Sequence, residues 1–137
     1  MTLGPLAVKL PGLNLAGTWP ITKELLDEVA VSLPHTSHLH LDPESISGSG
    51  WMRLTTLTSV FEIDLNGSSE VSLPMMSGIV VFAATAPHPG LTLRVILKFS
   101  NAADLAAWTD FADRLAERRS ILGLPPLKFI HKVSVVP

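Results

Sequence analysis

Hydrophobic and polar residues alternate in three segments of the chain, at residues 38–42, 91–99 and 127–136. Successive side chains of a β-strand point to opposite sides, so this alternation is the pattern of a strand with one buried face. A further short strand is expected at residues 6–10, before the Pro11-Gly12 turn. The pattern therefore predicts strands at both ends and in the middle of the chain.

Two segments have the spacing of amphipathic helices. The first, residues 21–33, carries a hydrophobic residue at every fourth position, which stacks these side chains on one face. The second, residues 101–122, has Asn101 as a candidate N-cap and Gly123 as a terminating residue. We expect this helix to connect strands 91–99 and 127–136 by a right-handed crossover, which makes those two strands parallel.

The middle of the chain is predicted as an antiparallel meander. Residues 51–65 are rich in Thr, Val, Phe and Ile, and Asn66-Gly67 is a dipeptide typical of tight hairpins. Residues 71–85 would then run back as the partner strand. We therefore expect one α+β domain over residues 1–137, with a mixed, mostly antiparallel sheet of five to six strands and two helices on one face, in the order β-α-β-β-β-β-α-β.

Composition shows that the chain is unusually poor in charge. Of the 137 residues 47% are hydrophobic and only 16% are charged, whereas a typical soluble domain has about 25% charged residues. Such a composition excludes intrinsic disorder, which requires low hydrophobicity and high net charge. The chain contains no cysteine, which excludes a disulfide scaffold and a cysteine-based zinc site.

The longest uncharged stretch, residues 71–93, raises the question of a membrane span. Only twelve residues separate Pro74 from Pro87 within it, too few for a helix to cross a hydrocarbon core of about 30 Å. The N-terminus lacks the charged start and long apolar run of a signal peptide. We expect a soluble protein, cytoplasmic or part of a larger assembly, with no membrane span.

The segment around residue 40 carries the most reactive side chains. If residues 38–42 form a strand, then His38, His40 and Asp42 share one face, and two imidazoles with a carboxylate are a donor set for Zn²⁺ or Fe²⁺. The alternative is an ordinary solvated strand face. Glu62 and Asp64 also share a strand face and could act as an acid–base pair, although adjacent acids on a strand are usually only solvated.

Charge is divided unevenly along the chain. Residues 1–93 carry three cations and eight anions, a net charge of −5, whereas residues 94–137 carry seven cations and four anions, a net charge of +3. If the two C-terminal strands are neighbours, four cations line one side of the sheet and form a candidate anion or nucleic-acid surface. These residues are Arg94, Lys98, Lys128 and Lys132. The alternative is a solvated face whose lysines discourage edge pairing.

Four large side chains are further candidates for contact with a partner. Trp19 precedes a proline at a helix entry and Trp51 follows a Gly-Ser turn. Tryptophan is over-represented among the residues that dominate binding energy. Met75 and Met76 lie in the uncharged stretch, which is either the innermost strand of the sheet or a surface that meets a partner.

These patterns leave three function classes. The low charge favours a non-enzymatic interaction or assembly module, either a self-associating structural subunit or an inhibitor- or immunity-type partner binder, because surface covered by a partner need not be polar. The first alternative is a small metal-dependent hydrolase or ligand-binding domain using His38, His40 and Asp42. The second is a nucleic-acid binder using the four cations. No catalytic residue is assigned and no organic cofactor is expected.

Overall fold

Five parallel strands form a single sheet in the computed structural model, which describes residues 12–33 and 35–136. The strands lie side by side in their order along the chain, β1-β2-β3-β4-β5. The predicted strand at residues 6–10 lies outside the described residues. The elements in chain order are β1 (Gly12–Asn14), α2 (Lys23–Ser32), β2 (His38–Leu41), η1 (Pro43–Ser45), α3 (Gly48–Thr56), β3 (Glu62–Glu70), α4 (Leu73–Thr85), β4 (Thr92–Phe99), α5 (Ala102–Ile121) and β5 (Lys128–Val135).

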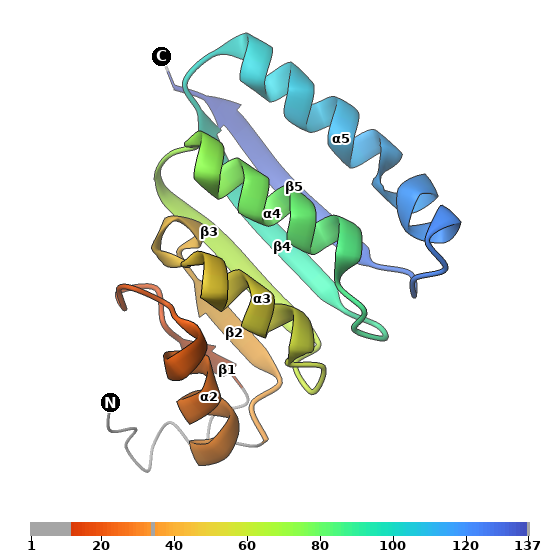
Figure 1. Ribbon diagram of the computed structural model, residues 1–137. Helices are drawn as coiled ribbons and strands as arrows, with labels where there is room; N and C mark the ends of the chain where they lie inside the picture. Colours follow the sequence, from red (N-terminus) through yellow and green to blue (C-terminus); the bar gives the residue numbers. More distant parts are fainter. Residues whose placement is uncertain (1–11, 34, 137) are drawn as a thin grey trace.

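One helix follows each of the first four strands, and all four helices pack on the same side of the sheet (Figure 1). The two sides of the sheet therefore differ. We call the side under the helices the covered face and the other side the open face. Because side chains alternate along a strand, each strand contributes residues to both faces.

The expected mostly antiparallel sheet with two helices is wrong, since the described residues form four helices and every strand pair among them is parallel. Neighbouring parallel strands must be joined by a crossover, usually a helix. Two segments expected as turn and strand supply these crossovers. Residues 48–56 form α3, and residues 73–85, expected as a returning strand, form α4.

The Asn66-Gly67 dipeptide lies inside β3 and does not form the predicted hairpin. Gly67 is on the covered face, where a Cβ atom would lie 3.0 Å from Met75 Cε of α4. The glycine therefore lets α4 pack closely against the sheet. Tertiary packing has overridden the local turn preference of these two residues.

Leucine and other aliphatic side chains fill the space between the covered face and the helices. Because the strands are in register, Leu13, Leu39, Ile63 and Leu93 lie in one row across four strands. Each of these side chains is at most 7% exposed. Trp108 of α5 is fully buried beneath its helix, as its position in the helical stripe predicts. The core is thus continuous along the sheet.

The C-terminal third of the chain agrees with the predictions made for it. β4 and β5 are parallel and joined by α5, which confirms the expected crossover. The Asn101 side chain accepts a hydrogen bond from Asp104 N at the start of α5. Gly123 adopts a φ of +70° after the end of the helix, a conformation that glycine adopts readily.

None of the helices in the described part of the chain is both long enough and apolar enough to cross a lipid bilayer. The longest uncharged stretch contains α4, which has 13 residues and packs in the core. Part of the apolar character of this stretch therefore serves internal packing, whereas Leu73 and Val81 are 84% and 57% exposed. Of its two candidate interaction residues, Met75 is 3% exposed and Met76 is partly buried against the core.

Candidate functional site

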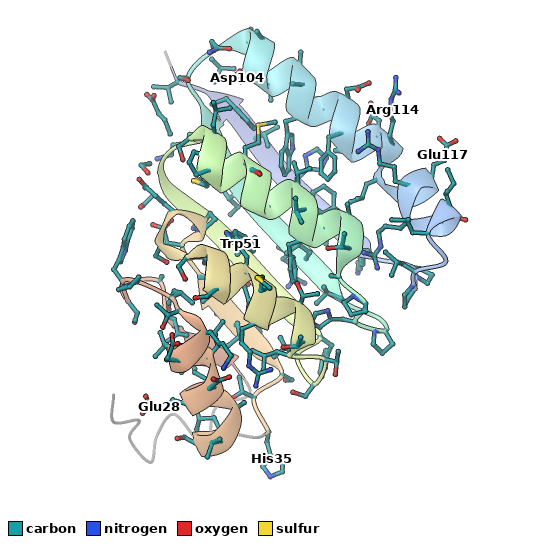
Figure 2. All side chains as sticks on the ribbon, viewed as in Figure 1. Glu28, His35, Trp51, Asp104, Arg114 and Glu117 are labelled. Carbon is teal, nitrogen blue, oxygen red and sulfur yellow. The ribbon has the colours of Figure 1, made fainter. Side chains whose placement is uncertain are left out.

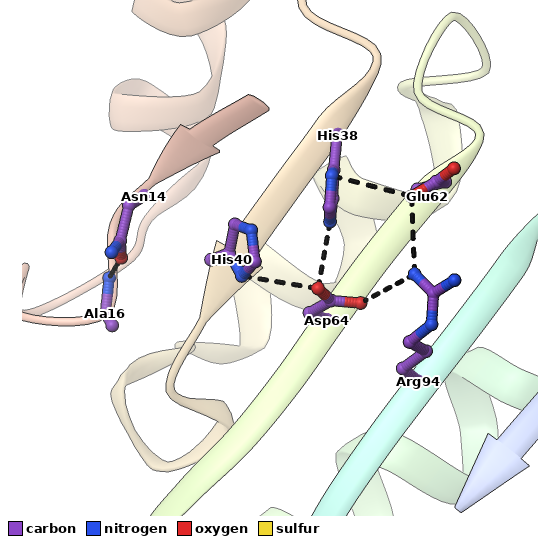
Figure 3. A network of polar contacts seen from close by, with 7 residues as sticks. All are labelled: Asn14, Ala16, His38, His40, Glu62, Asp64 and Arg94. Carbon is purple, nitrogen blue, oxygen red and sulfur yellow. Dashed lines mark hydrogen bonds and ion pairs between the residues drawn. The ribbon is translucent and has the colours of Figure 1, made fainter. Parts of the chain in front are cut away.

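Five polar side chains from three neighbouring strands converge on the open face (Figure 3). β2 contributes His38 and His40, β3 contributes Glu62 and Asp64, and β4 contributes Arg94. The parallel register aligns His38 with Glu62, and places His40, Asp64 and Arg94 in one row. We call these five residues the polar cluster.

Asp64 is the centre of the polar cluster. Its Oδ2 atom lies 2.9 Å from His38 Nε2 and 3.3 Å from His40 Nδ1. Its other oxygen, Oδ1, accepts a hydrogen bond from Arg94 Nη1 at 3.5 Å. Asp64 thus joins both imidazoles to the guanidinium.

Glu62 makes the second connection across the three strands. Its Oε2 atom accepts a hydrogen bond from Arg94 Nη1 at 3.3 Å and lies 3.5 Å from His38 Nδ1. The two ring nitrogens of His38 therefore face two different carboxylates. The five side chains are between 22% and 43% exposed, so solvent reaches the cluster from the open face.

The structure places Asp42 away from the two histidines with which it was grouped. Asp42 is 3% exposed and caps η1, where its side chain accepts a hydrogen bond from Glu44 N at 3.0 Å. It also accepts a hydrogen bond from the hydroxyl of Ser68. The carboxylate of Asp42 therefore serves the turn after β2, and Asp64 of the neighbouring strand occupies the place beside the histidines.

One ligand atom from each of His38, His40 and Asp64 can be chosen so that all three atoms lie within 4.8 Å of one another. Two imidazoles and one carboxylate are a donor set used by Zn²⁺ and Fe²⁺ sites that keep open coordination positions. An ion held in this way could activate water for hydrolysis. Without an ion, the same groups form a hydrogen-bonded His–Asp–Arg network.

The other half of the open face is basic. Arg94, Lys98, Lys128 and Lys132 lie on one side of the sheet, because Thr92 aligns with Lys128 and Ile96 with Lys132. Two exposed hydrophobic side chains, Ile96 at 44% and Ile130 at 41%, lie among these cations. An apolar centre with a charged surround resembles a protein-binding surface more closely than a nucleic-acid groove.

The open face is therefore divided along the strand order. β2 and β3 contain carboxylates and histidines but no lysine or arginine, whereas β4 and β5 contain four cations and no carboxylate. No family model, curated protein or solved structure matches this chain. The function of the open face must therefore be inferred from its own chemistry.

Neither of the two candidate tryptophans belongs to a strand of the sheet. Trp19 is 55% exposed in the segment before α2. Trp51 belongs to α3 and lies between α3 and α4, with its ring centroid 5.8 Å from that of Phe82 (Figure 2). Trp51 covers Gly78 so closely that a Cβ atom there would lie 2.2 Å from its Nε1 atom. Trp51 therefore serves helix packing, and only Trp19 is well exposed.

A cavity of about 570 Å³ lies between α5 and β5. Its lining includes Leu115, Arg119, Pro125, Leu127 and His131. None of its lining residues belongs to the polar cluster, so the cavity and the cluster are separate sites. His131 accepts a hydrogen bond from Trp108 Nε1 at 3.0 Å, which ties the ring to the core.

The structure buries one charged residue on the helix side, Arg119, whose role was not predicted from the sequence. Arg119 of α5 is 2% exposed and donates hydrogen bonds to the carbonyl oxygens of Ala83, Ala86 and Pro125, at 2.7–2.9 Å. It thereby caps the C-terminal end of α4, where a cation is favourable. The only signal in the sequence was its position in the last turn of a predicted helix. Arg119 has a structural role, and so the open face remains the candidate site.

Proposed function

We propose that the protein is a non-enzymatic interaction module that binds a second copy of itself through the open face. The observation that carries the proposal is that, among the described residues, no helix covers one side of the parallel sheet (Figure 1). Parallel sheets are almost always covered on both sides. In stacked strand–helix repeats, the side without helices commonly serves as a binding surface.

The division of charge on the open face suits a second copy. A two-fold axis that runs parallel to the strands, above β4, turns one open face toward the other. It then places the acidic half (Glu62 and Asp64) of each copy over the basic half (Lys128 and Lys132) of its partner. Both copies use the same surface in such an isologous interface, so every favourable contact occurs twice.

The size of the open face predicts a weak dimer. Five strands about 4.8 Å apart, each contributing about six residues at 3.3 Å, give a flat area of roughly 24 Å by 20 Å. This lies below the approximately 800 Å² per partner that a standard stable interface buries. Ion pairs at an exposed interface also weaken as salt screens them. We therefore expect dimerisation that depends on both protein concentration and ionic strength.

Sedimentation equilibrium at low and high salt tests this proposal. The wild-type protein is expected to show a monomer–dimer equilibrium that shifts toward monomer at high salt. The double variant Lys128→Glu/Lys132→Glu reverses two charges of the basic half and is expected to be monomeric. The matched control, Arg114→Glu/Arg118→Glu, makes the same charge change on α5, where Arg114 projects away from the sheet (Figure 2), and is expected to dimerise like wild type.

A wild-type protein that stays monomeric at every concentration would contradict the proposal, and so would equal loss of dimer in both double variants. Fluorescence anisotropy with a labelled oligonucleotide separates the nucleic-acid alternative. Oligonucleotide binding by a monomeric wild type, lost in Lys128→Glu/Lys132→Glu but kept in the α5 control, would replace self-association with nucleic-acid binding as the function of the basic half.

A further inference from the structure

We propose that His38, His40 and Asp64 bind a divalent first-row transition-metal ion of the Zn²⁺ type. The site combines two side chains from β2 with one from β3, and these strands are held in register by the sheet. The proposal does not depend on self-association, because all three ligands belong to one chain.

The carboxylate of Asp64 lies at distances from both imidazoles that are close to those between neighbouring ligands of a tetrahedral ion. Zn–N and Zn–O bonds of about 2.0–2.1 Å place neighbouring ligand atoms of a tetrahedron about 3.3 Å apart. Asp64 Oδ2 lies 2.9 Å from His38 Nε2 and 3.3 Å from His40 Nδ1. Asp64 is therefore placed to share an ion with either imidazole, and each of the three side chains offers a donor atom within 4.8 Å of the others.

The residues next to the three donors orient them as outer-shell groups do in metal sites. A metal-bound histidine commonly directs its second ring nitrogen to a carboxylate. His38 Nδ1 faces Glu62 Oε2 at 3.5 Å, which leaves Nε2 for the ion. Arg94 holds Asp64 through Oδ1, which leaves Oδ2 on the side of both imidazoles.

The donor types decide which ion the site selects. Imidazole nitrogens favour Zn²⁺ and similar transition metals, whereas Mg²⁺ and Ca²⁺ prefer sites made of oxygen atoms. Three protein ligands on a partly exposed face leave one coordination position or more for water or another ligand. The ion can enter directly from solvent, because His40 is 43% exposed.

Isothermal titration calorimetry with Zn²⁺ tests the site, at a protein concentration where light scattering shows a monomer. We expect one Zn²⁺ per chain and no binding of Mg²⁺. The variants His40→Gln and Asp64→Asn each remove a ligand and are expected to lower the affinity by more than about 100-fold, since losing only an outer-shell group costs 10–100-fold. Glu62→Gln is accordingly expected to lower it about tenfold.

The matched control is His35→Gln, which removes an exposed histidine that does not belong to the donor group of His38, His40 and Asp64 (Figure 2). Its Zn²⁺ affinity is expected to equal that of wild type. No saturable binding by wild type, or equal affinities in His40→Gln, Asp64→Asn and His35→Gln, would overturn the proposal.

A second measurement does not rely on variants that might fold poorly. In nuclear magnetic resonance spectra of the wild-type protein, Zn²⁺ is expected to shift the imidazole signals of His38 and His40, while those of His35 and His88 stay unchanged. Shifts at other histidines without shifts at His38 and His40 would assign the ion to another place and contradict the proposal.

Discussion

Leu93 and Arg94 are adjacent in β4, but their side chains lie on opposite faces of the sheet and in opposite environments. Leu93 is fully buried under the helices, whereas Arg94 is 43% exposed and connects Glu62 with Asp64. The same alternation holds along β2 and β3. The covered face therefore supplies most of the apolar burial that stabilises the fold, and the open face carries polar groups that take no part in this burial.

Replacing residues at adjacent positions of β4 gives the strongest test of this division. Leu93→Ala is expected to lower the free energy of unfolding by about 3–5 kcal/mol, because it leaves a cavity in the core. Thr92→Ala, on the open face, is expected to cost less than about 1 kcal/mol. Urea denaturation followed by circular dichroism measures both. Equal losses for the two variants would show that the open face also stabilises the fold.

Replacing Arg119 tests whether a buried charge on the helix side of the sheet stabilises the fold. Arg119→Met removes the guanidinium that caps α4 and leaves buried carbonyl groups unsatisfied, so we expect a loss of about 2–4 kcal/mol in unfolding free energy. The neighbouring Arg118 is exposed, and Arg118→Met is expected to change stability by less than about 0.5 kcal/mol. Chemical denaturation measures the unfolding free energy of both variants. An equally small loss of unfolding free energy in Arg119→Met and Arg118→Met would contradict the proposed capping of α4 by Arg119.

The smallest expected change in unfolding free energy concerns His88, and it appears only at acidic pH. Burial lowers the pKa of His88 below its ordinary value of 6.5, although the nearby carbonyl groups of Leu54 and Leu57 partly oppose this, and the charge of Arg119 lowers it further. The unfolded chain therefore binds a proton at a higher pH than the folded chain. Stability contributed by the neutral ring is complete above pH 6.5 and falls as the pH drops below it, by at most about 1.4 kcal/mol per pH unit.

His88→Phe keeps an aromatic ring beside Phe82 and removes the titration. We expect the loss of unfolding free energy between about pH 7 and pH 5 to be smaller in this variant than in wild type. Urea denaturation at several pH values measures it, and His35→Gln is the control at an exposed histidine. An unchanged acid response in His88→Phe would mean that other groups cause the sensitivity.

The sequence predicted the C-terminal third well because its signals are local. Residues 91–99 alternate strictly, and Asn101 and Gly123 mark the two ends of α5. The helix α4 gave no comparable signal in its interior, where residues 79–82 form an apolar run with three β-branched side chains. α4 lies between two helices, and its exposed side carries the apolar residues Leu73 and Val81, so no polar stripe reveals its period. Ser72 as N-cap and Pro74 in the first turn were the available signals for a helix.

The candidate site could be predicted only in part, because only some of its residues are close together in the sequence. The two-residue spacing of His38 and His40 is sufficient to place them on one face of a strand. Their partner, Asp64, is 26 residues from His38 in the sequence and joins it only through the register of β2 with β3. Asp42 was the nearer carboxylate, but the chain turns into η1 at that position.

The sequential order of the strands also has a consequence for how the chain folds. Aligned residues of neighbouring strands are 26, 24, 30 and 36 residues apart, from Gly12 and His38 through Glu62 and Thr92 to Lys128. Each strand thus meets its partner by closing one loop of moderate length, and the entropy of closure rises only slowly with length. The sheet can be assembled one strand–helix unit at a time from any nucleus, without a search for distant partners.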